Sequence, residues 1–308
     1  MAMEKISFAS AVRGVTVSAY FYPPEGETRA VVQIAHGMMD RMTRYTEMAK
    51  ALNRAGIAVV GNDHVGHGET AADRDALGFF GPRGARELVV QDMHTLSELA
   101  RQRFPGAPLI LIGHSMGSFL ARMYAERWGG ELSGLVLLGT GGRIAVLPLG
   151  KLLASLLACL RGRRHRSKFL AMTAFAGYNS RFKSEHSHLA WLSRDVACRE
   201  YYADDPLCRF LFTVSAYREL FGMTGEINRR AWFRHFPPAL PVLIASGDAD
   251  PVGAYGKGVR EVASRLCRHG AENVHLLLYP GARHELHHET NREEFFRDLT
   301  AFILEVSR

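Results

Sequence analysis

The sequence predicts an α/β protein in which a mostly parallel central sheet is flanked by helices. Three observations support this prediction. Short apolar runs alternate with segments of helical periodicity, and several runs end in glycine or polar residues. Continuous apolar runs of this length are typical of parallel strands that are buried on both faces of a sheet. Finally, residues 141–236 lack clear runs of this kind, which predicts a mostly helical insertion.

The predicted strands and helices follow one another regularly. In chain order the strands cover residues 31–35, 57–63, 108–113, 132–140, 241–246 and 274–281. The predicted helices cover residues 45–56, 85–104 and 115–128, and a last helix begins near Asn291. Gly56 is a natural C-cap for the first of these helices. Asn291 and Glu294 have the spacing of a capping box, which predicts the start of the last helix.

Residues whose side chains could act in catalysis or binding follow several of the predicted strands. His36 follows the first strand, Asp63 ends the second and Ser115 follows the third, and the stretch GDAD (247–250) comes after the fifth. Ligand sites of parallel sheets lie at the carboxyl ends of the strands. We therefore expect these side chains to gather on one rim of the sheet.

The stretch LILIGHSMGS (109–118) contains the pattern G-x-S-x-G around Ser115. A strand that ends in this turn before a helix is typical of the nucleophile elbow of serine hydrolases. A serine hydroxyl needs a base, and that base needs an orienting acid. The stretches GDADPV (247–252) and YPGARH (279–284) each follow a predicted strand, so acid and histidine come after the serine in the order expected for such enzymes. A plain glycine-rich turn is the alternative for the five residues alone.

Five stretches together carry a resemblance to a known family: HGMMDRMTRY (36–45), NDHVGHGET (62–70), GHSMGSFLA (113–121), SGDADPV (246–252) and YPGARHELHHE (279–289). In these stretches the sequence resembles the monoacylglycerol lipase and bacterial lysophospholipase group of α/β-hydrolases. The resemblance implies the α/β-hydrolase fold, with residues 1–140 and 237–308 as the core. It also implies that residues 141–236 form a helical cap, or lid, inserted into that core.

The resemblance implies a catalytic triad. Ser115 matches the nucleophile and His284 matches the base. The family's acid is the fourth residue of a G-x-x-D motif, which selects Asp250. The residues by themselves leave Asp248 open as the acid, because two carboxylates in one loop are also common in turns.

The resemblance also implies an oxyanion hole and a polar substrate pocket. The backbone N–H groups of Met38 and Met116 match the two donors that stabilise the developing oxyanion. The polar pocket for the glycerol head matches Asp40, Arg44 and His287. Asp40 stands where monoacylglycerol lipases commonly have glutamate, so its reach is shorter by one methylene.

We expect neither a metal nor a cofactor. His284, His287 and His288 lie close together in the sequence, but no carboxylate pattern accompanies them. His64 and His67 also have the spacing of a metal pair, and we assign their loop a structural role at the rim.

The insertion contains a second pattern. Residues 144–160 (IAVLPLGKLLASLLACL) are nearly all apolar, and a basic run follows at 161–168. This combination predicts an interfacial segment that contacts an anionic membrane. The alternative is a helix that packs on the hydrolase core, with solvated arginines. The two alternatives are compatible, and the sequence leaves both open.

The net charge limits the kinds of partner that we expect. Lys and Arg number 38 against 31 Asp and Glu, a net charge of +7 that favours anionic surfaces. No nucleic-acid-binding motif or basic–aromatic interleaving accompanies this charge, so we expect no nucleic-acid partner. The first residues lack the apolar core of a signal peptide, and no run reaches the length of a membrane span. These features predict a cytoplasmic protein that can sit at the inner face of the membrane.

The predicted function is hydrolysis of monoacylglycerols or lysophospholipids through an acyl-enzyme on Ser115. A carboxylesterase for short-chain or aryl esters is one alternative, and a ligand-binding hydrolase homologue with slow turnover is another. A peptidase ranks last, because the insertion shows no acidic cluster to anchor an α-amine.

Overall fold

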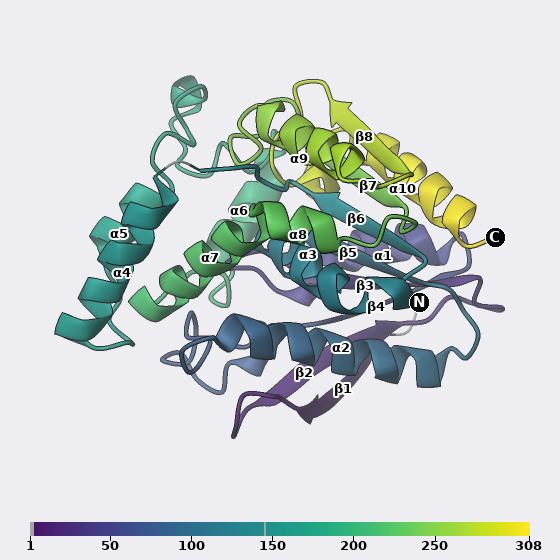
Figure 1. Cartoon of the computed structure of the whole chain (residues 1–308), viewed down its shortest axis with the longest axis horizontal. Helices are drawn as coiled ribbons and strands as arrows, with labels where there is room; N and C mark the ends of the chain where they lie inside the picture. The colour runs from purple at the N-terminus through teal and green to yellow at the C-terminus, as the bar shows by residue number, and fades with distance from the viewer. Residues whose placement is uncertain (1–2, 145) are drawn as a thin grey trace.

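The computed structural model describes residues 3–144 and 146–308, and its centre is a single eight-stranded sheet (Figure 1). The strands are β1 (Glu4–Ala9), β2 (Thr16–Tyr22), β3 (Ala30–Ala35), β4 (Ile57–Asn62), β5 (Leu109–His114), β6 (Gly134–Leu138), β7 (Val242–Gly247) and β8 (Val274–Tyr279). Their spatial order is β1-β2-β4-β3-β5-β6-β7-β8. β2 runs antiparallel to both β1 and β4, and all neighbouring strands from β4 to β8 are parallel. The prediction of a mostly parallel α/β sheet is confirmed.

Helices cover both faces of the sheet. The helices of the two layers are α1 (Thr46–Asn53), α2 (Ala85–Arg103), α3 (Met116–Trp128), α9 (Lys257–Arg268) and α10 (Arg292–Val306). One buried apolar cluster joins α1 and α10 to one face, and a second joins α2, α3 and α9 to the other. Every residue of β3, β4, β5 and β7 is buried. Burial on both faces explains why these strands are continuous apolar runs in the sequence.

The sequence analysis missed β1 and β2. β1 lies at the edge of the sheet, and only Ile6 and Phe8 are partly covered while its other side chains are exposed. An edge strand of this kind alternates instead of forming an apolar run, and its exposed Lys5 is typical of protected edges. A search for alternation with a period of two would have found it.

The segment between β6 and β7 contains five described α-helices: α4 (Leu147–Arg161), α5 (Lys168–Ala174), α6 (Val196–Asp204), α7 (Val214–Ile227) and α8 (Arg230–His235). We call residues 141–236 the cap segment. α7 contacts both α3 and α4, so it connects the cap segment to the sheet layers. α4 and α5 lie at the left-hand end of the molecule in Figure 1, beyond α7 and away from the sheet. Among the described residues, no helix is both long and apolar enough to cross a membrane.

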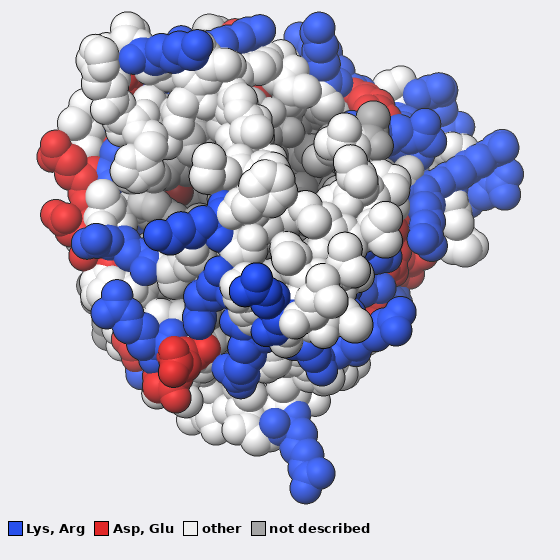
Figure 2. Space-filling model, turned by 90° about the vertical axis from the view of Figure 1, so that its left-hand side faces the viewer, with Lys and Arg blue, Asp and Glu red and all other residues white. Residues whose placement is uncertain are grey.

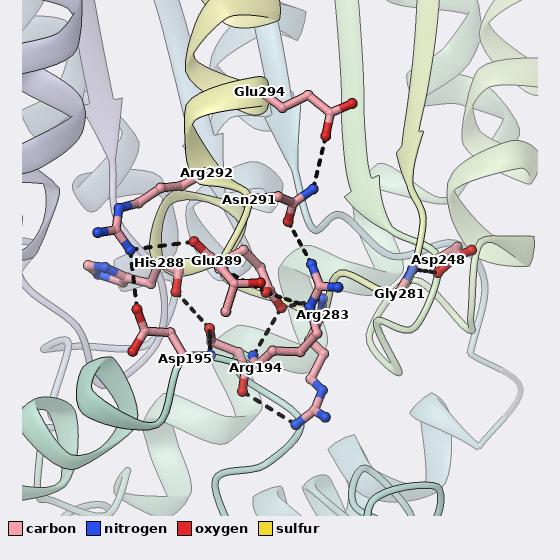
Figure 3. Close-up of polar contacts among 12 residues, drawn as sticks. Arg194, Asp195, Asp248, Gly281, Arg283, His288, Glu289, Asn291, Arg292 and Glu294 are labelled. Atoms are coloured by element: carbon pink, nitrogen blue, oxygen red, sulfur yellow. Dashed lines mark hydrogen bonds and ion pairs between the residues drawn. The ribbon is translucent and has the colours of Figure 1, made fainter.

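The start of α10 differs from the expected capping box. The Asn291 side-chain oxygen accepts a 2.6 Å hydrogen bond from Arg194, and its amide donates to the carboxylate of Glu294 at 3.0 Å (Figure 3). The side chain of Asn291 therefore makes no capping bond to the helix backbone. The capping-box prediction was wrong: the Asn291 backbone (φ −105°, ψ 27°) is outside the extended region of an N-cap, and its side chain binds Arg194 and Glu294 instead.

Candidate active site

Ser115 occupies the turn between β5 and α3. Its φ of 54° and ψ of −119° are uncommon for a residue that carries a side chain. A Cβ atom on Gly117 would lie 2.0 Å from the carbonyl oxygen of Ala35, and one on Gly113 would lie 2.4 Å from the carbonyl oxygen of Gly117. Both positions therefore require glycine. The G-x-S-x-G spacing follows from the close approach of α3 to the end of β3.

His284 and Asp250 form a buried pair near the ends of β8 and β7. The His284 Nδ1 lies 3.0 Å from the Asp250 Oδ2, and both side chains are almost completely shielded from solvent. The other Asp250 oxygen accepts the Val252 N–H at 2.8 Å, so the carboxylate is held from both sides. This geometry fixes the imidazole so that its Nδ1–H points to Asp250, which leaves Nε2 as the free nitrogen.

Asp248 has a different partner. Its carboxylate accepts the Gly281 N–H at 2.7 Å and links the ends of β7 and β8 (Figure 3). The contact to His284 is thus made by Asp250, while Asp248 stabilises the turn. The sequence alone could not tell which of the two carboxylates contacts His284, and their positions in the loop determine it.

The pKa of His284 is raised above the ordinary histidine value. Burial by itself lowers it, because the charged imidazolium loses its water shell. The charge of Asp250 and the hydrogen bond to it outweigh that effect, and the charges of Glu285 and Asp40 add to it. His284 is therefore a stronger base than a free imidazole.

Ser115 and His284 line the same cavity, which has a volume of about 380 Å³. Its walls are largely apolar and come from the sheet layers and the cap segment, including Phe119, Leu147, Leu153, Phe175, Leu220 and Phe221. Its polar lining includes Asp40, His114 and Glu285. An apolar chamber with a few polar groups at one place is typical of a small-molecule site.

Two backbone N–H groups remain free beside Ser115. Met116 begins α3, so its N–H has no partner within the helix. Met38 follows β3 in a loop in which Met39 has a positive φ of 53°. Within the described residues, neither N–H has a backbone or side-chain acceptor, and both methionines line the cavity. The two groups are available to an oxyanion.

A buried ion-pair network forms part of the polar side of the cavity. The Arg44 guanidinium binds Glu285 through two hydrogen bonds of 2.9 and 2.8 Å and Asp40 through a third of 2.8 Å. Burial raises the pKa of both carboxyls, but the charge of Arg44 outweighs it and holds both pKa values below their usual range. Both carboxylates are therefore ionised, and Arg44 binds both of them.

The predicted pocket residues do not all reach the cavity. Asp40 lines it, whereas Arg44 and His287 are not among the described residues that do. His287 is buried and stacks on the ring of Tyr45, with ring centroids 4.5 Å apart. Tyr45 in turn donates to Asp40 at 2.7 Å. Arg44 and His287 thus support the polar wall from behind.

The described part of the chain contains one cluster with metal-ligand spacing, formed by His94, Glu98 and Glu131. Arg101 already forms ion pairs with both of these carboxylates. His64 and His67 lie in a different cluster, in which the His36 and His64 rings are tilted against each other with their centroids 4.2 Å apart. These rings are buried, and the structural role of their loop stays a prediction.

The basic run at 161–168 is partly engaged within the protein. Arg163 donates to the carbonyl of Gly81, and Arg164 and Arg166 donate to the carbonyl of Asp75. These arginines anchor the cap segment to the loop before α2. The neighbouring α4 exposes an apolar stripe, formed by Leu149, Leu152, Leu156 and Leu160.

The sequence analysis missed three residues next to His284. Glu285 carries the bidentate contact to Arg44, Trp191 places its ring 5.0 Å from the His284 ring, and Glu289 binds the backbone N–H of Arg283. A charged residue directly after the candidate base was a visible signal for Glu285. No local signal marked Trp191, because it lies 93 residues away and reaches the site only through the fold.

Comparison with known proteins agrees with the fold. A family model described as serine aminopeptidase, S33 (Hydrolase_4) matches residues 26–291. A monoacylglycerol lipase from Mycolicibacterium smegmatis is 30% identical over 304 residues, 97% of this chain and 96% of the lipase. The human monoglyceride lipase is 26% identical over 87% of this chain and 80% of its own length.

A solved structure is similar along the whole chain. The thermostable carboxyl esterase from Bacillus coagulans, crystallised with glycerol, superimposes with a TM-score of 0.93 at 31% identity, and each chain is covered completely. The fold and these relatives define a serine hydrolase of the monoacylglycerol lipase and esterase kind. The chain belongs to the Hydrolase_4 family of α/β-hydrolases.

Proposed function

We propose that this chain hydrolyses monoacylglycerols or lysophospholipids through an acyl-enzyme on Ser115. The observation that carries the proposal is the largely apolar cavity that Ser115 and His284 line together with a few polar side chains. An acyl chain fits the apolar part, and the alcohol fits the polar part. The printed names of the mycobacterial and human relatives support the same substrate class.

In the first step, the Ser115 hydroxyl oxygen attacks the ester carbonyl carbon while its proton passes to His284 Nε2. Asp250 holds the opposite ring nitrogen and stabilises the imidazolium that forms. The N–H groups of Met38 and Met116 receive the negative charge that develops on the carbonyl oxygen. These donors are fixed by the fold before the reaction, so little free energy is spent on orienting them.

In the second step, the bond to the alcohol oxygen breaks and His284 gives its proton to that oxygen. The alcohol leaves, and the acyl group remains on Ser115. Water then repeats the sequence, with His284 again as base, and releases the fatty acid. Of the three residues predicted to contact the head group, Asp40 faces the alcohol. Arg44 and His287 support the cavity wall behind Asp40.

We further propose that the cap segment, residues 141–236, acts as a lid with a lipid-facing side. Val146 and Leu149 line the cavity and are nevertheless 70% and 68% exposed. The exposed stripe of α4 continues from this place. Figure 2 shows the end of the molecule that carries α4 and α5, where a broad uncharged area is bordered by Lys and Arg.

This distribution supports docking on an anionic membrane. Lys151, Arg161 and Lys168 are exposed beside the stripe. Apolar side chains enter the acyl boundary, and the basic groups contact the lipid phosphates. A substrate could then pass from the membrane into the cavity without crossing water.

A carboxylesterase for short-chain or aryl esters is the second candidate. The similarity to the carboxyl esterase from Bacillus coagulans favours it. The two candidates share the triad and differ in the acyl chain that fills the chamber. A preference for short p-nitrophenyl esters would support this second candidate.

The family description raises the peptidase alternative. Release of an N-terminal residue needs a free carboxylate for the substrate's α-amine. Among the described residues that line the cavity, the carboxylates are those of Asp40 and Glu285, and Arg44 binds both. Their engagement favours an ester substrate.

The experiment measures fatty acid release from 1-acylglycerols, lysophosphatidylcholine and p-nitrophenyl esters of increasing chain length. We expect release to peak on long-chain monoacylglycerol or lysophospholipid. Ser115→Ala should lower turnover at least about 10³-fold, as loss of a triad nucleophile does elsewhere. Ser264→Ala, at an exposed position of α9 outside the cavity, is the matched control and should keep wild-type activity. Near-normal turnover by Ser115→Ala would refute the proposal, and labelling by a fluorophosphonate without turnover would indicate a ligand-binding homologue.

A further inference from the structure

A short part of the cap segment, residues 190–195, runs alongside the loop that carries His284. The Glu285 N–H donates to the Leu192 carbonyl at 2.8 Å, and the His284 N–H lies 3.4 Å from the Trp191 carbonyl. The Ser193 hydroxyl donates to the His288 carbonyl at 2.7 Å. The two segments are thus joined by hydrogen bonds along their length.

The carboxylate of Glu289 is the centre of this contact (Figure 3). One oxygen accepts the backbone N–H of Arg283 at 2.8 Å and that of Arg194 at 3.1 Å. The other oxygen accepts Arg194 Nε at 2.8 Å and the Thr290 N–H at 3.0 Å. Glu289 is 1% exposed, so these four donors replace the water that its charge has lost.

These bonds bear on His284 directly. Arg283 precedes His284, so the peptide held by Glu289 is adjacent to the candidate base. Arg194 lies three residues after Trp191, whose ring is 5.0 Å from the His284 ring and lines the cavity. Glu289 therefore fixes both the backbone that carries the imidazole and the segment that carries the ring packed against it.

We propose that Glu289 is a positioning residue for His284 and that residues 190–195 form a fixed wall of the active site. This inference rests on the proposed function, because it assigns His284 the role of the base. Glu289 acts through Arg283 and Arg194 and does not touch the substrate. Catalysis is sensitive to such placement, since a shift of about 1 Å in a reacting group costs about 10²-fold in rate.

The test is Glu289→Gln, which keeps the size of the side chain and removes its charge. We expect kcat for p-nitrophenyl butyrate to fall about 10- to 100-fold while KM changes less than about threefold. Rates are expressed per active site, counted by complete reaction with a fluorophosphonate. This count separates misplacement of His284 from loss of folded protein.

Arg292→Gln is the matched control. Arg292 forms a 3.2 Å ion pair with Asp195 across the same two segments, and its Nη1 lies 3.5 Å from the Glu289 carbonyl oxygen, but it makes no contact with the Glu289 carboxylate (Figure 3). It loses one charge in the same interface and should keep kcat within about twofold of wild type. If kcat falls equally in both variants, Glu289 acts only as a structural contact like any other in this interface. That result would overturn the inference.

Arg194→Gln provides a second variant in case Glu289→Gln does not fold. The Arg194 side chain is about one-third exposed, and the change leaves its backbone N–H bond to Glu289 in place. We expect the same selective loss of kcat, and a less than additive loss in the double variant, because both changes break one contact. Wild-type kcat per active site in Arg194→Gln and in any folded Glu289→Gln protein would overturn the inference. If the wild-type chain itself shows no turnover that depends on Ser115, the proposed function fails instead.

Discussion

Arg44 and Glu285 form a bidentate ion pair, with hydrogen bonds of 2.9 and 2.8 Å, directly behind the candidate base His284. Both side chains are buried, and the same guanidinium binds Asp40 in the loop that carries Met38. One cation therefore joins the loop with the free N–H group to the loop with the imidazole. The pair connects two parts of the site that are 241 residues apart.

Arg44→Met should destabilise the protein strongly. The change leaves two buried carboxylates without their cation, which costs about 3–5 kcal/mol for a buried pair. The measurement is urea unfolding followed by circular dichroism. Lys50→Met is the control, because its pair with Glu47 is exposed and is worth about 0–1 kcal/mol. Equal midpoints for the two variants would contradict the role assigned to Arg44.

Asp250→Asn should change the pH dependence of catalysis. His284 works as a base only when neutral, so kcat/KM falls as the pH drops through its raised pKa. Without the charge of Asp250 that pKa falls, and the acidic limb moves to lower pH. We also expect kcat to fall about 10⁴-fold, as it does when a triad aspartate is replaced. Asp248→Asn should leave the acidic limb of the pH profile and kcat close to wild type. If instead Asp248→Asn lowers kcat and Asp250→Asn does not, the acid is Asp248.

Gly117→Ala should destabilise the turn that carries Ser115. The new methyl group would lie 2.0 Å from the Ala35 carbonyl oxygen, so α3 must move away from β3. We expect a loss of about 3 kcal/mol in the free energy of unfolding, together with loss of activity. Gly130→Ala is the control, because a Cβ there meets no atom within 4 Å. Similar stability of the two variants would show that the elbow tolerates a larger residue.

Leu152→Glu should weaken membrane binding without affecting the chemistry. Leu152 is 66% exposed on α4, and burial of one leucine is worth about 1.5–3 kcal/mol, so binding should fall about tenfold or more. Co-sedimentation with vesicles of phosphatidylcholine and phosphatidylglycerol measures it, with p-nitrophenyl butyrate hydrolysis as the check on the site. Val196→Glu, on α6, is the matched control for an exposed apolar residue. Unchanged binding by Leu152→Glu would count against α4 as the lipid-facing side.

The sequence determined the features that depend on local geometry. Apolar runs marked the buried strands β3 to β7, because burial on both faces favours apolar residues. The role of the glycines around Ser115 could be recognised in the sequence, because a tight turn limits the size of the residues directly beside it. The placement of Ser115, Asp250 and His284 on one rim was expected from the rule that parallel strands end on the same side of the sheet.

The tertiary structure decided which side chains meet. Asp250 and Asp248 are equivalent by local pattern, and only the packing of the β7 and β8 ends brings Asp250 to His284 and Asp248 to Gly281. Arg44 matched the family's polar pocket, but in the fold it does not line the cavity and binds the carboxylates of Asp40 and Glu285, which do. Glu289 and Arg194 are 95 residues apart, and no periodic pattern in the sequence indicates that they are in contact. Such contacts form where loops from different strands and from the cap segment converge, so their partners are set by the three-dimensional path of the chain.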